Sequence, residues 1–208
     1  MHTGNVVNKK TADQFVSRAE GKLEGAVRAF HYDFRDKTVL DIGSSTGGFT
    51  ELALKLGAKK VIAIEIGTRQ MKAPLRFDPR IELHEKTDFF DCVKEPAEGK
   101  TLISPVETVV ADVSFVSLTK ILAHAKKVVG RDTDFLVMLK PQFEASKEQL
   151  WKGVVKNEKT RREIISRFEF WLKNNGFVVM NKRDNEVIGK NGNQERFYFL
   201  KIAKKSTR

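Results

Sequence analysis

The sequence is poor in cysteine and has no long apolar run. Only Cys92 among its 208 residues is a cysteine, and no stretch of about 18 residues is apolar throughout. A lone cysteine excludes a disulfide within the chain and is typical of a reducing compartment. The first residues contain no apolar core of the kind found in secretory signals. We therefore expect a cytoplasmic protein that does not cross a membrane.

Metal ligands are also sparse. The four histidines, His2, His31, His84 and His124, are scattered along the sequence, and none forms a close pattern with Cys92. Metal sites need several such side chains at characteristic spacings. The sequence therefore predicts no bound metal.

Positive charge, in contrast, is in excess. Lys and Arg number 38 against 27 Asp and Glu, which gives a formal net charge of +11. A basic protein attracts nucleic acids, because neutralising their phosphates releases counterions. A polyanionic partner such as a nucleic acid is therefore one interpretation of the charge, and a generic solvated basic surface is an equal alternative. An anionic membrane surface is disfavoured, since no basic amphipathic segment carries a broad apolar face with aromatic anchors.

The segment Thr38–Thr50 is the most informative part of the chain. It consists of TVLDIGSSTGGFT, where an apolar run predicts a buried strand and a loop of small residues follows. The next residues predict a helix over 49–56. A strand, a glycine-rich turn and a helix are what α/β proteins use to bring their backbone against a nucleotide-like ligand. Gly43, Gly47 and Gly48 lack side chains, so ligand atoms can approach the main chain there.

Further apolar patterns alternate between strands and helices. Strands are predicted at 60–65, 80–85, 107–112 and 134–140, and helices at 13–30, 118–129 and 160–174. Near the C-terminus, 176–181 and 196–203 have the pattern of an antiparallel pair of strands joined by a Gly/Asn loop.

Together these elements predict an α/β, Rossmann-like methyltransferase fold. Strands that alternate with helices form a mostly parallel sheet with helices on both faces. Seven strands that end in an antiparallel hairpin are typical of S-adenosylmethionine-dependent methyltransferases rather than of NAD-binding dehydrogenases. No repeat or linker divides residues 13–208, so we expect one domain there, preceded by a polar appendage at 1–12.

The loop sequence restricts which ligands are expected. Glu65 ends the second predicted strand 24 positions after Asp41, close to the spacing at which an acid reaches the ribose hydroxyls of a nucleoside. The loop lacks the Gly-Lys-Ser/Thr of a phosphate-binding loop and does not fit Gly-x-Gly-x-x-Gly. A cofactor without phosphates, S-adenosylmethionine, therefore fits better than ATP or NAD. Asp41 is placed to reach its methionine amino group or a water.

Asp88 follows the third predicted strand, where an acid can meet the exocyclic amine of adenine. A role for Asp88 as a turn or helix-capping residue is an equal alternative. For residues 41–48 the alternative is a tight turn between strand and helix that binds nothing.

Two further charged residues, Asp112 and Lys140, end apolar runs. A lysine on an otherwise apolar strand is costly unless it is paired or used, because burial favours its neutral form. Such a lysine can accept a proton from a weakly acidic hydroxyl at neutral pH. The alternative is a strand-end lysine whose ammonium reaches solvent, and the same alternative applies to Asp112.

Four motifs in this order resemble those of the TlyA (hemolysin A) family, FtsJ-like methyltransferases of ribose 2′-hydroxyls in ribosomal RNA. They are Asp41–Thr50, Ala111–Ser117, Leu139–Glu144 and Gly153–Val155. The similarity extends over residues 13–203. It implies S-adenosylmethionine as the cofactor and RNA, above all ribosomal RNA or ribosomal subunits, as the partner.

The resemblance also implies which residues act. The Lys-Asp-Lys-Glu catalytic set of the family falls on Lys22, Asp112, Lys140 and Glu195. Lys140 is then the candidate to steer and deprotonate the hydroxyl, and Asp112 holds its position and charge state. Lys22 and Glu195 would orient the ribose, and alignment of oxygen, methyl and sulfur would supply much of the rate. The expected cofactor-binding residues are Asp41, Gly43, Ser44, Ser45, Thr46, Gly47, Gly48, Phe49, Glu65, Asp88 and Asp112.

Two features depart from the family pattern. The family more often has Ser-Arg-Gly-Gly before its first catalytic lysine, whereas Ala19 and Glu20 precede Gly21 and Lys22 here. Members also usually begin with a small RNA-binding domain, whereas only residues 1–12 precede the catalytic helix here. We therefore expect RNA affinity to be weakened.

Two other functions stay open. A methyltransferase fold that only binds RNA or assists ribosome assembly would have no need of the four catalytic residue types. A membrane-active hemolysin would need an apolar or lytic amphipathic segment, which the sequence lacks. Both are therefore disfavoured against a methyltransferase.

Overall fold

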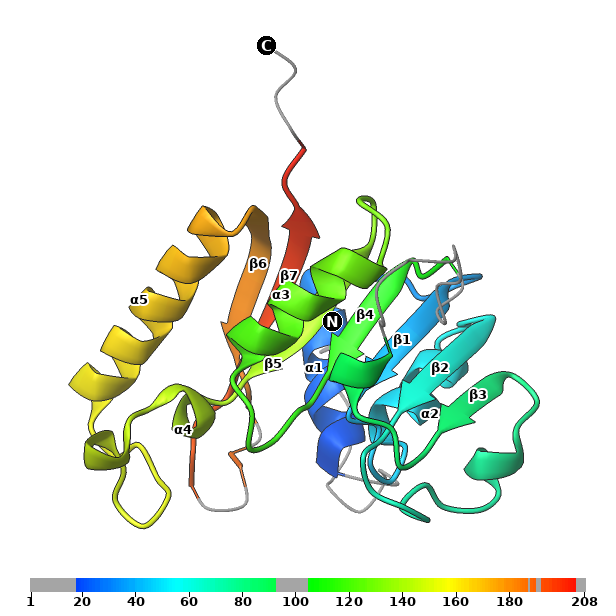
Figure 1. Ribbon diagram of the computed structural model, residues 1–208, viewed down its shortest axis with the longest axis horizontal. Coiled ribbons are helices and arrows are strands. Elements are labelled where there is room, and N and C mark those ends of the chain that lie inside the picture. Colours follow the sequence, from blue (N-terminus) through cyan, green and yellow to red (C-terminus); the bar gives the residue numbers. More distant parts are fainter. Residues whose placement is uncertain (1–17, 93–104, 187, 190–191, 205–208) are drawn as a thin grey trace, which may run out of the picture.

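The computed structural model describes residues 18–92, 105–186, 188–189 and 192–204 (Figure 1). The predicted appendage at 1–12 and the first five residues of the helix predicted at 13–30 lie outside these described residues. Seven strands form one sheet in the order β3-β2-β1-β4-β5-β7-β6. The strands are β1 (Thr38–Ile42), β2 (Lys60–Ile64), β3 (Ile81–His84), β4 (Thr108–Ala111), β5 (Asp134–Leu139), β6 (Phe177–Asp184) and β7 (Arg196–Ile202).

The sheet is parallel except at its C-terminal hairpin. Strands β1 to β5 pair in parallel, and β7 lies antiparallel between β5 and β6. Every residue of β1, β4 and β5 is buried, because helices cover both faces of a parallel sheet. The predicted seven-stranded, mostly parallel sheet with a C-terminal antiparallel hairpin is confirmed.

Helices precede β1 and connect β1 to β2, β4 to β5 and β5 to β6. They are α1 (Arg18–Phe30), α2 (Gly48–Lys55), α3 (Leu118–Val128), the single turn α4 (Pro141–Glu144) and α5 (Glu158–Asn174). Short 3-10 turns occur at Leu75–Phe77, Phe89–Asp91 and Lys147–Gln149. Within the described part of the chain, no helix has the length and apolar character that a membrane crossing requires.

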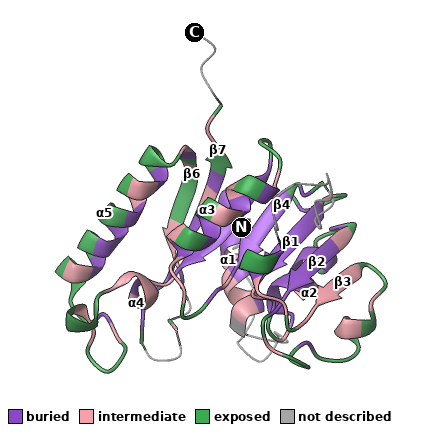
Figure 2. Cartoon of the chain, in the orientation of Figure 1, coloured by how far each residue is buried: buried purple, intermediate pink, exposed green. Residues whose placement is uncertain are grey.

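The helices form a layer on each face of the sheet (Figure 1). Helices α1 and α2 pack on one face together with Val39 and Val110, whereas α3 and α5 pack on the other face together with Leu40 and Val109. Neighbouring residues of one strand enter different cores because side chains alternate across a sheet. Figure 2 shows these buried strands enclosed between helices whose outer surfaces are exposed.

The element boundaries differ slightly from the sequence predictions. Helix α5 begins two residues earlier than predicted, because the Asn157 side chain accepts hydrogen bonds from the backbone N–H groups of Lys159 and Thr160. Strand β6 continues to Asp184, which pairs with Arg196 on β7 through both the backbone register and a carboxylate–guanidinium contact. The turn α4 was not predicted, since four residues starting at a proline carry no helical periodicity.

Helix α5 offers a matched test of the core. Leu172 is fully buried in the core below α5, whereas Phe170 on the same helix is 69% exposed. We expect Leu172→Ala to lower the free energy of unfolding by about 2–5 kcal/mol through the cavity it leaves. Phe170→Ala should change it by less than about 0.5 kcal/mol. Urea denaturation measures both, and equal losses would contradict this packing.

Candidate active site

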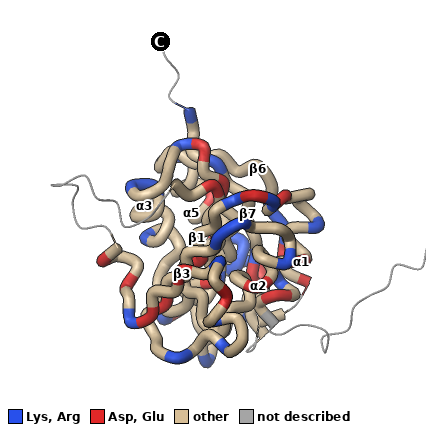
Figure 3. The backbone as a smooth tube through the Cα atoms, turned by 90° about the vertical axis from the view of Figure 1, so that its right-hand side faces the viewer, with Lys and Arg blue, Asp and Glu red and all other residues tan. Residues whose placement is uncertain are grey.

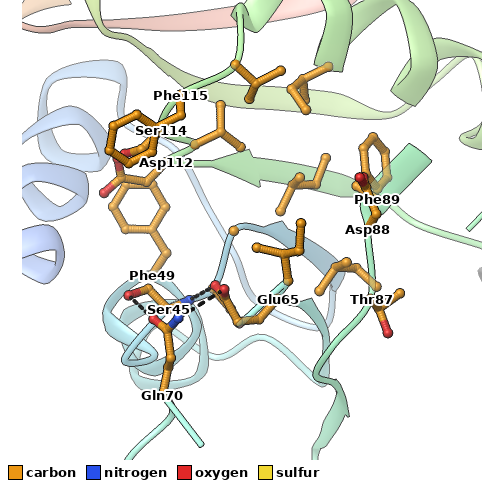
Figure 4. Close-up of a pocket in the computed structure, with 18 of the residues that line it drawn as sticks. Ser45, Phe49, Glu65, Gln70, Thr87, Asp88, Phe89, Asp112, Ser114 and Phe115 are labelled. Atoms are coloured by element: carbon orange, nitrogen blue, oxygen red, sulfur yellow. Dashed lines mark hydrogen bonds between the residues drawn. The ribbon is translucent and has the colours of Figure 1, made fainter. Parts of the chain in front are cut away.

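A pocket of about 730 Å³ opens at the carboxyl ends of the parallel strands. Ligands bind at this edge in open parallel sheets. Asp112 and Ser114 lie on one side of the pocket, and Glu65 and Asp88 lie on the other (Figure 4). The predicted cofactor-binding residues that line it are Gly43, Ser44, Ser45, Thr46, Gly48, Phe49, Glu65, Asp88 and Asp112.

Gly47 belongs to the glycine-rich loop but is not among the residues that line the pocket. Its φ of 95° is in the left-handed region that favours glycine. A Cβ at this position would collide with the side chain of Leu75. The glycine is therefore required by the turn and by the packing of Leu75, whereas Gly43 and Gly48 face the pocket.

Glu65 connects the end of β2 to the glycine-rich loop. Its buried carboxylate accepts hydrogen bonds from the backbone N–H groups of Ser45 at 2.8 Å and Gly67 at 2.6 Å. The Gln70 side chain donates to it at 3.3 Å and accepts from the Ser45 hydroxyl at 3.1 Å. A carboxylate has about four acceptor positions, so Glu65 keeps capacity for a ligand. Sequence reasoning missed Gln70, because it follows no strand and belongs to no motif.

Asp88 has the capping role that the sequence left as one alternative, and its contact with adenine stays a prediction. Its side chain caps the 3-10 turn that follows by accepting from the Phe90 N–H at 2.9 Å. It also lines the pocket beside Thr87 and Phe89.

Asp41 lies beneath the loop and does not line the pocket. It is completely buried, and its Oδ2 accepts a hydrogen bond from the Thr50 hydroxyl at 2.6 Å. Its Oδ1 has no hydrogen-bond partner among the described residues. Burial, together with the nearby carboxylates of Asp112 and Glu65, raises the pKa of Asp41 to about 7, although the hydrogen bond from Thr50 opposes the rise.

Lys140 and Asp112 form an ion pair in the pocket wall. The Lys140 Nζ lies 2.6 Å from Asp112 Oδ1 and donates to the Ser114 hydroxyl at 2.9 Å. The two charged side chains are only 11% and 18% exposed. Both line the pocket. The ammonium is therefore held in the wall by its partners and is not directed into bulk solvent.

Lys22 and Glu195 form a second buried ion pair. The Lys22 Nζ lies 2.5 Å from Glu195 Oε2, and the side chains are 11% and 4% exposed. The sheet register pairs Arg196 with Leu139, so Glu195 and Lys140 leave their strands at the same end. Ala19, one turn before Lys22 on α1, lines the pocket. The four predicted catalytic residues are thus gathered at one edge of the sheet, although Lys22 and Glu195 themselves do not line the pocket.

The motif Gly153–Val155 supports the segment that carries Glu195. The side chain of Asn193, which is buried, accepts from the Val155 N–H at 3.0 Å and donates to the Gly153 carbonyl at 3.1 Å. These contacts hold the loop after α4 against the start of β7.

Glu144 joins the segments that carry Asp112 and Lys140. Its carboxylate accepts from the Ser117 hydroxyl at 2.7 Å and from the Leu118 N–H at 2.6 Å, at the start of α3. Burial raises the pKa of Glu144, and these two hydrogen bonds oppose the rise. Its role could not be predicted, because its partners lie 26 and 27 positions away in the sequence.

The architecture and the pocket define an α/β protein with a Rossmann-like methyltransferase fold. A candidate S-adenosylmethionine-dependent methyltransferase of Listeria monocytogenes has this fold, with a TM-score of 0.61 over 88% of this chain and 100% of that one. At 18% identity the similarity concerns the fold alone.

Among the described residues, no group of three or more potential metal ligands occurs.

Closer similarities show the family. The chain matches the family described as FtsJ-like methyltransferase over residues 15–202 and belongs to it. It is 35% identical to the 16S/23S rRNA (cytidine-2′-O)-methyltransferase TlyA of Mycobacterium tuberculosis over 90% of this chain and 68% of that protein. The crystal structure of a hemolysin candidate from Lactococcus lactis matches with a TM-score of 0.82 and 34% identity, over 90% of this chain and 88% of that one.

The chain is shorter than its curated relatives. It spans 64% to 75% of the lengths of those it matches along most of its own length. The family and fold predicted from the four motifs are confirmed by these comparisons, and the roles of individual site residues stay predictions.

The buried carboxyl of Asp41 predicts a pH-dependent stability. The folded chain keeps this proton up to about pH 7, whereas an ordinary aspartate releases it near 3.8. Rising pH within this window therefore favours the unfolded chain, by up to about 1.4 kcal/mol per pH unit. We expect Asp41→Asn to gain stability relative to the parent chain as pH rises. Urea denaturation of both proteins near pH 5 and pH 7 measures this, and a difference that does not change with pH would contradict it.

The contacts of Glu144 predict a loss of stability on truncation. We expect Glu144→Ala to lower the free energy of unfolding by about 1–2 kcal/mol, because Ser117 and the start of α3 lose their acceptor. Glu148→Ala is the matched control, since Glu148 is exposed and close in sequence. Its cost should stay below about 0.5 kcal/mol. Thermal denaturation compares the two, and similar shifts would show that Glu144 has no special role.

Proposed function

We propose that this chain transfers a methyl group from S-adenosylmethionine to a ribose 2′-hydroxyl of RNA. The observation that carries the proposal is the ion pair of Lys140 with Asp112 in the wall of an acidic pocket. A ribose hydroxyl is a poor nucleophile and needs a group that positions it and takes its proton. In this proposal residues 13–208 form the methyltransferase domain, 1–12 are an appendage, and the protein works in the cytoplasm.

The charges around the pocket favour a cationic cofactor that has no phosphates. Glu65, Asp88 and Asp112 line the pocket. Lys140 is the sole cation among the described residues that line it, and Asp112 already neutralises it. The phosphates of ATP or NAD would face like charges here, whereas a sulfonium and an amino group would face opposite ones.

Two buried polar atoms without hydrogen-bond partners also favour S-adenosylmethionine as the ligand of this pocket. Ser44 Oγ and Asp41 Oδ1 are buried and have no hydrogen-bond partner within the described residues. Such atoms are costly unless a ligand or water satisfies them. Both lie in or under the glycine-rich loop, where the methionine part of the cofactor would bind. Bound S-adenosylmethionine supplies a methyl group on a positively charged sulfur, which is a strong electrophile.

Other residues of the pocket would hold the nucleoside part. Glu65 is proposed at the ribose hydroxyls, because its carboxylate is fixed by the Ser45 and Gly67 backbone and retains acceptor capacity. Asp88 is proposed at the exocyclic amine of adenine, with Phe89 beside it in the wall. Gly43, Ser45, Thr46, Gly48 and Phe49 would complete the cofactor contacts, with Gly47 shaping the loop.

Lys140 is proposed to act on the target hydroxyl. Its Nζ is held by Asp112 and Ser114, which fixes its position before substrate arrives. In its amine form it can accept a hydrogen bond from the hydroxyl and take its proton. The methyl–sulfur bond of a bound cofactor would break as the methyl–oxygen bond forms, and S-adenosylhomocysteine would leave. Asp112 stabilises the ammonium that results. Holding the hydroxyl in line with the methyl group would also raise the rate, because the reacting atoms are already oriented.

The Lys22–Glu195 pair is proposed to orient the target ribose. It lies at the same edge of the sheet as Lys140, and its two charges neutralise each other. A buried, paired lysine can donate to a ribose oxygen without adding net charge beside the acidic pocket.

RNA is the proposed partner for two reasons. The chain has a formal net charge of +11, which favours a polyanion. Figure 3 shows basic residues interspersed with acidic ones on the face that carries β3 and α2, so the positive charge does not form one continuous patch on that face. The TlyA protein of M. tuberculosis is named as a methyltransferase of ribosomal RNA. We infer ribosomal RNA, in a ribosomal subunit, as the substrate of this chain.

Substitution of Lys140 tests the mechanism. We expect Lys140→Ala to lower methyl transfer to ribosomal subunits by about 100-fold or more, because the group that positions and deprotonates the hydroxyl is lost. Lys140→Arg should be similarly inactive, since arginine keeps a positive charge but cannot accept a proton. Labelled methyl incorporation measures both, and calorimetry should show cofactor binding largely kept.

Lys127→Gln is the matched control, because Lys127 is exposed in the last turn of α3, away from the pocket. Its activity should equal that of the parent chain. Methylation that survives Lys140→Ala would overturn the mechanism. If the parent chain labels neither ribosomal nor transfer RNA, the proposed function itself fails.

A further inference from the structure

The loop between α4 and α5 displays an aromatic side chain at the carboxyl edge of the sheet. Trp151 is 61% exposed, whereas the other tryptophan, Trp171, packs against Phe168 and Phe177. The Lys152 Nζ lies 5.9 Å from the centre of the Trp151 ring. Figure 1 shows this loop beside α4.

Hydrogen bonds hold this loop in a defined shape. Trp151 and Val154 exchange two backbone hydrogen bonds, of 2.9 and 3.0 Å. Asn193 then fixes Gly153 and Val155 from the other side. Asn193 lies two positions before Glu195. The loop that carries the exposed tryptophan is therefore hydrogen bonded to the segment that carries a proposed catalytic residue.

The lysines on the loop and at the start of α5 have no ion-pair partner among the described residues. Lys147, Lys152, Lys156 and Lys159 are exposed, and none forms an ion pair with another described residue. Other exposed lysines, such as Lys55 and Lys182, are paired with glutamates, but Lys120, Lys127 and Lys173 are exposed and also lack an ion pair with a described residue. The loop differs from these because its lysines surround an exposed tryptophan. The loop carries Lys147, Lys152 and Lys156 against one acidic residue, Glu148, so it presents net positive charge around an exposed aromatic ring.

We propose that Lys147, Trp151, Lys152 and Lys156, here called the Trp151 surface, bind a single-stranded stretch of RNA next to the target nucleotide. A base stacks on the Trp151 ring, and the lysines contact the adjoining phosphates. Aromatic rings amid basic residues are how proteins hold unpaired nucleotides without reading their sequence. A fully paired duplex offers no free base face to stack. This inference rests on the proposed function, since it concerns the same RNA.

Tryptophan fluorescence tests the stacking directly. In a Trp171→Phe background, Trp151 is the sole tryptophan, and its emission is followed while a ten-nucleotide single-stranded RNA is added. We expect quenching that saturates together with the anisotropy of the labelled RNA. An oligomer of the same length with abasic sites should bind more weakly and quench little. The difference in emission between the parent chain and Trp151→Phe gives the same readout without altering Trp171.

Variants separate stacking from charge. Trp151→Ala should weaken RNA binding by about fivefold or more, the lower bound set by known base–aromatic stacking. Each of Lys147→Gln, Lys152→Gln and Lys156→Gln should reduce the slope of log affinity against log salt by about 0.7. Phe170→Ala and Lys127→Gln are the controls, because they remove an exposed aromatic and an exposed lysine elsewhere.

The outcomes distinguish this inference from the proposed function. Unchanged Trp151 emission at saturating RNA, or equal quenching by the abasic oligomer, would overturn the Trp151 surface. Quenching by RNA-free ribosomal proteins but not by RNA would mean a protein partner and would also overturn it. If methylation proceeds equally in Trp151→Ala, the inference fails while the proposed function stands. If RNA quenches Trp151 but no methyl is transferred to any RNA, the proposed function fails while the surface stands.

Discussion

The contact between Lys140 and Asp112 depends on the parallel register of β4 and β5. Ala111 pairs with Val137 in that register, so the residues that follow the two strands emerge at the same edge of the sheet. An ammonium and a carboxylate at 2.6 Å then compensate each other where neither is well exposed to water. The pocket, its acidic lining and the second ion pair all lie at this edge, and their proposed chemistry needs the lysine there.

Contacts between distant segments hold this edge together. Glu144 binds the start of α3, so the loop after β4 and the turn after β5 keep a fixed relation. Asn193 binds the loop after α4 to the start of β7. The carboxylate of Glu65 similarly fixes the glycine-rich loop to the end of β2. The site is therefore assembled from loops that cap parallel strands, and each loop is fixed by a hydrogen bond to another.

The sequence predicted the features that local patterns encode. The strand and glycine-rich loop within Thr38–Thr50 could be predicted because an apolar run and the small residues that follow it are patterns of only a few positions. What it could not predict depends on distant segments. The packing of Leu75 against Gly47 and the capping of α3 by Glu144 require the folded backbone. The Lys22–Glu195 pair, 173 positions apart, was expected only through the family resemblance.

In the proposed reaction the methyl group goes to a ribose 2′-oxygen of RNA. The most direct measurement is to incubate the protein with labelled S-adenosylmethionine and separated, unmodified ribosomal subunits, and then to digest the RNA to nucleosides. Mass spectrometry identifies where each label resides. We expect the label on a 2′-O-methylated nucleoside. Label on a base, or on a ribosomal protein with none on ribose, would contradict it.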